Sequence, residues 1–399
     1  MNNLRSFSTR VLSKTKWENP KKASPSSNSE ALEFPCSSEL VEKAMKPAIF
    51  TTQRDLTRYL KKHVLAHAPG RFVVVRKPYG VSCVGVPLEN GGVFENSVHD
   101  KKKTEKWISS VKERRSHTDE VTVAGSLNKL GDLLKEPELT FCTGLKRYIS
   151  GAIVLPCNDK DLNILKNCIR EMTTDNEPPY MYNSLAITVG RPEKRSGFIE
   201  GFATFRNLGK HVEYIFEQRK VTKRAKSGKY AVSGWMQYQV LDHQNGLSLV
   251  EFSTNKFARH LPRLMLTQLG SPIFGDQIYW RRIANVDDHP TLVTAGSRGH
   301  KIYIPDQLSK VMNVELTKPL LNHFPMYCHV YKTIFDSVGG HEEHGLVASD
   351  KPQTYFLSML ELSGLLPAYQ NFMRKTETDV PVDTDLTDPL IRNSGETKF

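Results

Sequence analysis

The stretch Thr143-Gly144-Leu145-Lys146-Arg147-Tyr148-Ile149-Ser150-Gly151, followed by the apolar run Ala152-Ile153-Val154-Leu155, decides the fold of this chain. The first part is basic and ends in Ser150-Gly151, a typical turn pair, and the second is the β-branched, apolar kind of run that forms buried strands. The pattern predicts a basic loop that enters a buried strand. An ordinary surface loop before a strand has the same pattern, so other stretches must distinguish the two interpretations.

Two further stretches flank this loop in the sequence. Upstream lies the strand-like Phe72-Val73-Val74-Val75-Arg76-Lys77-Pro78-Tyr79-Gly80. Downstream lie His260-Leu261-Pro262-Arg263 and Leu269-Gly270-Ser271-Pro272-Ile273-Phe274-Gly275-Asp276. In this order the three stretches resemble the RluA-type RNA pseudouridine synthases. Those enzymes have a Lys-Pro-x-Gly strand end, a His-Arg-Leu-Asp-x-x-Thr-Ser-Gly catalytic loop, and an Arg-Thr-His-Gln-Ile-Arg segment before Gly-His-Pro-Ile-x-Gly-Asp.

The resemblance implies a fold and a reaction. The expected fold is α+β, with a mixed, mainly antiparallel sheet, flanking helices and a basic RNA cleft. The expected reaction converts uridine in RNA to pseudouridine, with no cofactor and no metal. One Asp acts as nucleophile or base, an Arg orients it, and a Tyr stacks on a base that has been extruded from its RNA context.

Carrying the catalytic motif over residue by residue gives an unexpected result. Counting back from Ser150-Gly151, the position of the family's Asp is Lys146, whose ammonium cannot act as a carboxylate nucleophile. Replacement by an upstream acid (Asp132, Glu136 or Glu138) would require a precise placement that this part of the chain does not indicate. The altered loop is similar to that of a divergent mitochondrial branch of the family, the domain-containing protein 3 subgroup, which is linked to pseudouridylation of mitochondrial RNA.

The other catalytic positions are partly retained. The orienting Arg of the family corresponds to Arg263. The family's Tyr corresponds to Ser184, and Tyr182 lies two residues earlier on the same face of the predicted strand, so it is the expected substitute. Lys146, Tyr182 and Arg263 are therefore the predicted catalytic positions.

The charge of the chain favours a polyanionic partner. Of its 399 residues 55 are Lys or Arg and 43 are Asp or Glu, which gives a net charge of +12 and favours nucleic acid. The densest basic stretch, residues 219–230, is interpreted either as an RNA-backbone contact or as a strand edge guarded by lysines. The predicted RNA-binding residues are Lys77, Arg147, Lys220, Lys223, Arg224, Lys226, Arg259 and His260.

The N-terminal residues have the composition of a targeting segment. Residues 1–14 are rich in Arg and Ser, have no acid, and place apolar and basic side chains on opposite faces of a helix, which is typical of a mitochondrial transit peptide. A disordered basic arm is the alternative. No apolar run is long enough to span a membrane. The six cysteines form no Cys-x-x-Cys pair, which argues against a zinc ribbon.

The expected organisation follows from these patterns. Residues 1–35 form a transit peptide and linker, residues 36–340 an RluA-like pseudouridine synthase domain, and residues 341–399 a partly disordered C-terminal extension. Helices are expected at 38–43, 52–65, 127–134, 160–169, 256–269 and 355–373. Strands are expected at 72–76, 152–155, 180–189, 202–205, 212–216, 232–241, 247–252, 302–304 and 327–331.

Three functions remain to be distinguished. The first is an RNA pseudouridine synthase with a rearranged site, acting on mitochondrial rRNA or mRNA in the matrix. The second is an inactive relative that binds rRNA during mitoribosome assembly, where mitoribosomal or assembly-factor proteins would be further partners. The third, a DNA-binding factor, would need a helix-turn-helix or zinc motif, and the sequence has neither.

Overall fold

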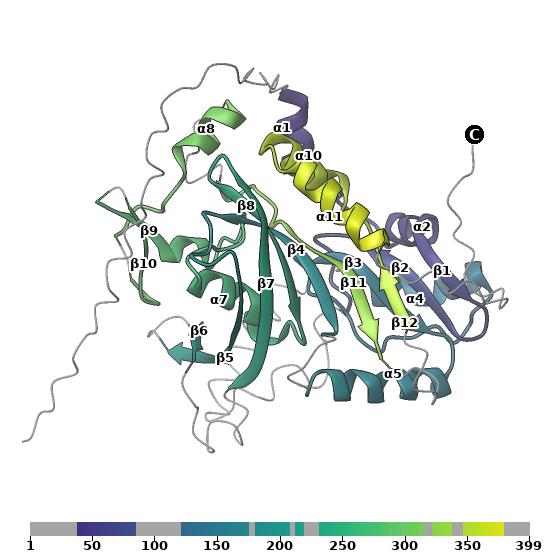
Figure 1. The fold of residues 1–399 in the computed structure, drawn as a ribbon. Helices are drawn as coiled ribbons and strands as arrows, with labels where there is room; N and C mark the ends of the chain where they lie inside the picture. The colour runs from purple at the N-terminus through teal and green to yellow at the C-terminus, as the bar shows by residue number, and fades with distance from the viewer. Residues whose placement is uncertain are drawn as a thin grey trace, which may run out of the picture.

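The computed structural model describes residues 38–84, 121–174, 180–207, 212–218, 231–287, 289–297, 299–313, 316, 321–336 and 346–378. One large mixed sheet crosses the molecule, and helices cover its ends and faces (Figure 1). The expected α+β fold with a mainly antiparallel sheet is confirmed. Among the described strands of this sheet, β3 and β11 pair in parallel, and all other neighbouring strands pair antiparallel.

Ten of the described strands form the main sheet, in the order β1-β2-β3-β11-β4-β8-β7-β5-β6, with β12 paired to β11 beside this path. Their bounds are β1 Val64–Ala68, β2 Phe72–Lys77, β3 Ser150–Pro156, β4 Tyr182–Val189, β5 Ser196–Asn207, β6 Val212–Glu217, β7 Val232–Gln244, β8 Leu247–Thr254, β11 Cys328–Phe335 and β12 Leu346–Ser349. A separate ribbon pairs β9 Ile283–Val286 with β10 His289–Leu292.

The strand that follows the basic loop lies near the middle of the sheet. Every residue of β3 is buried, as expected for a continuous apolar run between two neighbouring strands. Its register pairs Lys77 of β2 with Gly151 and His329 of β11 with Ser150. The loop before β3 is therefore fixed at the edge where β2 ends and β11 begins.

The described helices begin at recognisable caps. The side chains of Thr52, Thr122 and Asn158 each accept a hydrogen bond from a backbone N–H in the first turn of α2, α4 and α5, which stabilises a helix start. The α-helices are α1 Ser38–Met45, α2 Gln53–Lys62, α4 Val123–Leu134, α5 Asp159–Met172, α7 Leu261–Gln268, α8 Asp306–Met312, α10 Thr354–Leu362 and α11 Leu366–Thr378, and the short 3₁₀ turns are η1 Ala258–His260 and η2 Trp280–Arg282.

The structure corrects three predicted elements. The helix expected at 52–65 ends at Lys62, and the following residues form β1. The helix expected at 355–373 is two helices, because Gly364 between them has a φ of 75°, a left-handed conformation that ends α10. The strand expected at 302–304 is reduced to an isolated bridge between Ile302 and Ala284.

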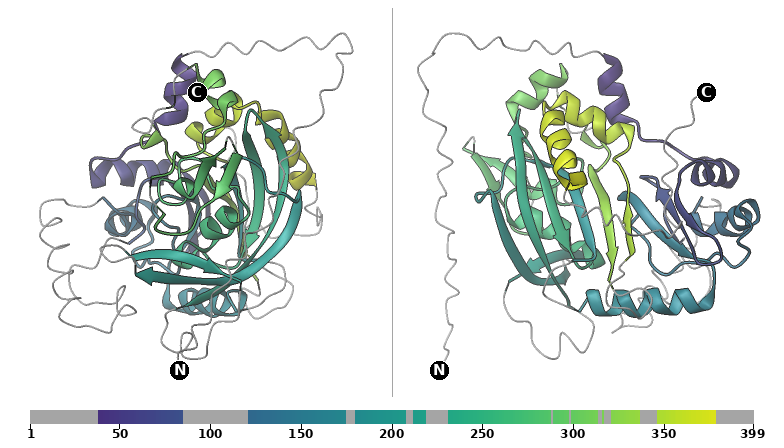
Figure 2. Two further views of the ribbon diagram at one scale, coloured as in Figure 1. Left: turned by 90° about the vertical axis from the view of Figure 1, so that its left-hand side faces the viewer. Right: turned by 45° about the vertical axis from the view of Figure 1, so that its right-hand side comes forward.

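The C-terminal residues are part of this fold. Strand β12 pairs with β11, and α10 packs against α1 (Figure 2). The buried carboxylate of Asp350 pairs with Arg76 of β2 at 2.5 Å. The folded unit thus continues from 346 to 378, beyond the predicted boundary at 340. Residues 1–35 and 379–399 lie outside the described residues.

Candidate functional site

Lys77 fixes the loop from the inside. It is 0% exposed, and its ammonium donates hydrogen bonds to the carbonyl oxygens of Pro78 (2.9 Å), Arg147 (3.3 Å) and Ile149 (2.6 Å). The backbone N–H of Gly80 donates to the same Arg147 oxygen at 2.9 Å. Burial lowers the pKa of Lys77 to about 8. The prediction that Lys77 contacts RNA is wrong, because its cation is enclosed by the loop that it holds.

The loop exposes its two basic residues. Leu145 is buried, whereas Lys146 and Arg147 are exposed. A turn closed by the Ile149 N–H on the Lys146 oxygen, at 2.9 Å, sets this alternation. Lys146 lies two residues before Tyr148, whose ring centre is 5.8 Å from that of His260, and its charge is among those that lower the pKa of His260. The position of the family's Asp thus presents a solvated cation.

Arg263 is already occupied by a carboxylate. Its Nε and Nη2 donate to the two carboxylate oxygens of Asp276 at 2.7 and 2.6 Å. Asp276 also accepts the backbone N–H groups of Ile278 and Tyr279, both at 3.0 Å. Burial alone would lower the pKa of Arg263, but the charge and hydrogen bonds of Asp276 raise it. The guanidinium lies 4.4 Å from the centre of the Tyr148 ring and 4.9 Å from that of Tyr279, which adds cation–π attraction.

His260 is surrounded by three tyrosines. Its ring centre lies 5.8 Å from that of Tyr148, 5.4 Å from Tyr214 and 5.8 Å from Tyr279, and its Nδ1 shares a hydrogen bond of 2.9 Å with the Tyr279 hydroxyl. Burial, and then the charge of Arg263, lower the pKa of His260 to about 3. The imidazole is therefore neutral at pH 7, and any contact with RNA would be through its ring face or a hydrogen bond rather than a charge.

The backbone before α7 brings these side chains together. Arg259 and His260 have φ angles of 48° and 63°, a left-handed conformation that non-glycine residues rarely adopt in succession. The helix predicted to begin at 256 consequently begins at Leu261, with Pro262 in its first turn. The turn places the half-buried Arg259 and His260 immediately before the helix that carries Arg263.

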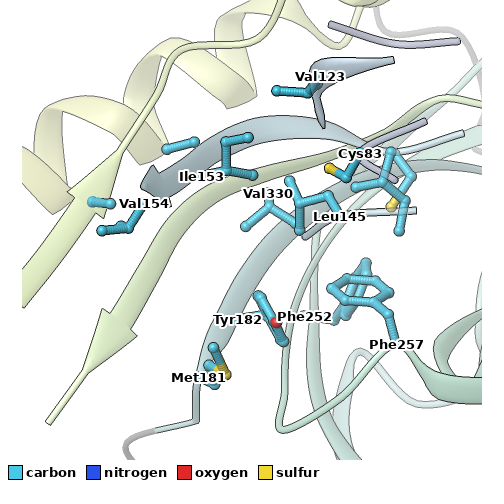
Figure 3. Packing of buried hydrophobic residues seen from close by; sticks show 14 of the residues in the cluster. Cys83, Val123, Leu145, Ile153, Val154, Met181, Tyr182, Phe252, Phe257 and Val330 are labelled. Atoms are coloured by element: carbon cyan, nitrogen blue, oxygen red, sulfur yellow. The ribbon is translucent and has the colours of Figure 1, made fainter. Parts of the chain in front are cut away.

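The tyrosine expected to serve catalysis packs beneath the loop. Tyr182 is 6% exposed, its ring centre lies 5.2 Å from that of Phe257, and its hydroxyl lies 3.3 Å from Thr143 Oγ1. Burial raises its pKa to about 12. Figure 3 shows it in the apolar cluster with Phe252 and Leu145. The structure thus assigns Tyr182 to packing and corrects its prediction as an accessible, base-stacking residue.

The position of the family's tyrosine offers no replacement. Ser184 is 0% exposed, and its hydroxyl has no hydrogen-bond partner within the described part of the chain. It pairs in register with Phe252 of β8 and Val330 of β11. A buried hydroxyl in the middle of the sheet cannot stack on a base.

The structure brings some of the predicted residues together, and it adds residues to the site that the sequence does not indicate. Lys146, Arg259, His260 and Arg263 do gather at one place. Lys220, Lys223, Arg224 and Lys226 lie outside the described residues. The tyrosines at 148, 214 and 279 and the role of Asp276 were not predicted. Asp276 belongs to the quoted Gly275-Asp276 pair, but nothing in the sequence indicates that it is the partner of Arg263.

The described residues contain neither a metal-binding cluster nor a membrane-spanning helix. No group of three or more His, Cys, Asp or Glu side chains is arranged to hold a metal ion in this part of the chain. No helix in the same part is long and apolar enough to cross a membrane.

Comparisons with known proteins support the fold. No protein-family model matches the chain, and no curated protein sequence matches it. Among solved structures, it is similar to human RNA Pseudouridylate Synthase Domain Containing 4, with a TM-score of 0.53 and 18% identity over 78% of this chain and 97% of that one. Human RNA Pseudouridylate Synthase Domain Containing 1 gives a TM-score of 0.43 and 14% identity over 74% and 85%. The first of these shows that the chain has the fold of a pseudouridylate synthase domain.

Proposed function

We propose that this protein binds RNA with the loop at 143–150 and the residues before α7, and that it does not isomerise uridine. The supporting observations are the fold shared with a human protein named as a pseudouridylate synthase domain, the net charge of +12, and the composition of the site. A single observation carries the second half of the proposal: the cation of Lys146 stands where the resemblance requires a carboxylate.

The bond-breaking step of the synthase reaction needs an accessible acid. Asp276 is the carboxylate bound to Arg263, but its side chain is 0% exposed, and it accepts two hydrogen bonds from Arg263 and two from backbone N–H groups. A carboxylate held in this way orients Arg263 and cannot approach a ribose carbon. The guanidinium of Arg263, which by the resemblance would orient the catalytic Asp, is therefore already bound to Asp276 in the interior.

The same site has features that suit RNA. Lys146 and Arg147 are exposed cations, and Tyr148, Tyr214 and His260 are half-buried rings. Proteins that bind single-stranded RNA combine such cations, which contact phosphates, with aromatic rings, on which bases stack. Replacing an acid by Lys146 changes the local charge by two units toward attraction of a phosphate.

An active synthase is the second candidate. It is favoured by the retained Arg263 and by the fold, and it would need an acid from elsewhere in the chain. Mitochondrial rRNA or mRNA is the proposed RNA, the mitochondrial matrix the proposed location, and a mitoribosomal or assembly-factor protein a proposed partner. These three proposals rest on the transit-peptide composition of residues 1–35.

Fluorescence anisotropy with a labelled single-stranded RNA tests the binding proposal. The Lys146→Ala/Arg147→Ala double variant should bind more weakly, and its salt dependence should flatten by about 0.7 for each lost phosphate contact. Lys61→Ala/Lys62→Ala is the matched control, because both lysines are exposed on α2, which packs on α4 and β2. Equal weakening of both variants, or no binding by the unaltered protein, would contradict the proposal.

A further inference from the structure

Three arginines gather around one buried carboxylate beside the aromatic site. Arg206 of β5 lies opposite Glu213 of β6 in the strand register. Arg281 of η2 places its Nη2 3.6 Å from Glu213 Oε2. Arg282 follows in the same turn, with its Nε donating to the Val293 oxygen at 3.3 Å. The β5–β6 pair and the turn after α7 thus bring three guanidinium groups to one place.

The charge of this cluster is not balanced by its own carboxylate. Glu213 is 6% exposed, and its Oε1 has no hydrogen-bond partner among the described residues. Burial lowers the pKa of Arg282, and although Glu213 opposes this, the charges of Arg206 and Arg281 lower it further. Burial is the largest cause of this shift, and the excess of positive charge follows from the composition of the cluster, which has three guanidinium groups and one carboxylate. Arg206 and Arg281 are exposed and Arg282 is half-buried, so an anion can reach them.

The cluster is continuous with the site that contains Lys146. Tyr279, two residues before Arg281, has its ring centre 5.8 Å from that of His260, and the ring centre of Tyr214 on β6 lies 5.4 Å from that of His260. The ring centre of the same imidazole lies 5.8 Å from that of Tyr148 in the loop. Helix α7 packs against β6 (Figure 1). A row of rings therefore connects the exposed cations of the loop with the arginine cluster.

We propose that Arg206, Arg281 and Arg282 bind the phosphates of a single-stranded RNA segment whose other end contacts Lys146 and Arg147. This inference rests on the RNA binding proposed above and adds a second contact point and a path between the two. The planar guanidinium fork matches phosphate oxygens, and the rings between the two ends accept unpaired bases rather than a duplex, whose bases remain stacked on one another.

Length-dependent binding tests this path. Oligouridylates of about 4 and about 16 nucleotides cover the usual range of site sizes for single-strand-binding domains. With the longer RNA, Arg206→Ala/Arg281→Ala should weaken binding and flatten the salt slope by about 1.4, since each of two lost contacts contributes about 0.7. With the shorter RNA, whose few phosphates cannot occupy all five proposed cations at once, the effect should be smaller. Both arginines are exposed, and a thermal melt confirms that the variant is folded.

A second variant, which is expected to strengthen RNA binding, distinguishes the proposal from a folding defect, because a folding defect would weaken binding. Glu213→Gln preserves the shape of the side chain and removes the internal negative charge, so it should tighten binding of the longer RNA and steepen the salt slope. A purely structural role of the arginines, to neutralise Glu213, predicts no gain.

The outcomes separate this inference from the proposed function. In one outcome Lys146→Ala/Arg147→Ala loses affinity for RNA, whereas Arg206→Ala/Arg281→Ala binds RNA as tightly as the Lys61→Ala/Lys62→Ala control. That result would overturn the path and leave the proposed RNA site at the loop unaffected. Failure of the unaltered protein to bind either RNA would overturn both. Binding of polyglutamate as tight as that of the longer RNA would also overturn the path, because it would indicate an acidic protein as the partner.

Discussion

Arg263 holds Asp276 through two of its guanidinium nitrogens, with Nε and Nη2 at 2.7 and 2.6 Å from the two carboxylate oxygens. Both side chains are buried, and the carboxylate is completed by two backbone N–H groups. The pair connects α7 with the loop before η2 at the centre of the site. Its geometry gives Arg263 a structural role that does not depend on a carboxylate at position 146.

The first prediction concerns this pair. Asp276→Asn should lower the free energy of unfolding by about 3–5 kcal/mol, because it leaves the buried guanidinium of Arg263 without a counter-charge. Denaturant titration measures the loss. Asp132→Asn on the exposed face of α4 is the control, and its effect should stay within about 0.5 kcal/mol. Similar values for both variants would show that the pair contributes no stability.

The second prediction concerns Lys77 at alkaline pH. Its pKa is about 8 in the folded protein and near its ordinary 10.5 when unfolded, so between these values the unfolded state binds more protons and the contribution of Lys77 to stability rises with pH. From pH 8 to 10.5 the unfolding free energy of the unaltered protein should therefore increase relative to that of Lys77→Met.

Subtracting the variant from the unaltered protein removes the contribution of the other groups that titrate in this range, including tyrosines and cysteines with raised pKa values. Lys62→Met on the exposed end of α2 is the matched control, and its difference should not change with pH. A constant difference for Lys77→Met would mean that the enclosed ammonium keeps an ordinary pKa.

The third prediction orders three variants of one exposed residue. RNA affinity should fall modestly in Lys146→Ala and further in Lys146→Asp, with larger effects at low salt, because the charge near the phosphate decreases by one and then by two units. All three proteins should unfold at similar denaturant concentrations, since the side chain is exposed. Equal RNA affinity of the three proteins at low salt would exclude Lys146 from the RNA contact.

Lys146→Asp should also fail to create a synthase. The new carboxylate would find Arg263 already bound to Asp276, and Ser184 supplies no phenol to stack on the base. Residues that act as a unit do not recover activity one at a time. Pseudouridine formation by this variant would show that the remaining site is competent.

The fourth prediction concerns location. Residues 1–35 fused to a fluorescent protein should reach mitochondria, because their first 14 residues, which include Arg5 and Arg10 and no acid, have the composition of a transit peptide. Replacing both with Glu should stop import. Retention of the unaltered fusion in the cytosol would contradict the prediction.

The elements that bury continuous apolar runs could be predicted from the sequence. The strand expected at 72–76 is β2, and that expected at 152–155 lies within β3, because β-branched residues between turn signals have few other conformations. The helix boundary at Leu261 could not be predicted, since the left-handed His260 before it makes its contacts with tyrosines from three other segments.

The chemistry of the site was harder to predict than its position. The substitution at Lys146 is visible in the sequence, but the enclosure of Lys77 depends on three carbonyl groups, two of which lie some 70 residues away in the chain. A lysine in a basic protein is usually exposed, so sequence reasoning assigned it to RNA. The Arg263–Asp276 pair and the ring contacts of His260 likewise exist only once the sheet has formed.

Pseudouridine quantification after incubation of the purified, unaltered protein with mitochondrial RNA from cells lacking it tests the central claim most directly. We expect the RNA to be bound, with a steep salt dependence, and its pseudouridine content not to rise above that of a no-protein control. A rise in pseudouridine at a defined uridine, unchanged in Lys146→Ala, would contradict the account, because it would show that another acid in this chain performs the reaction.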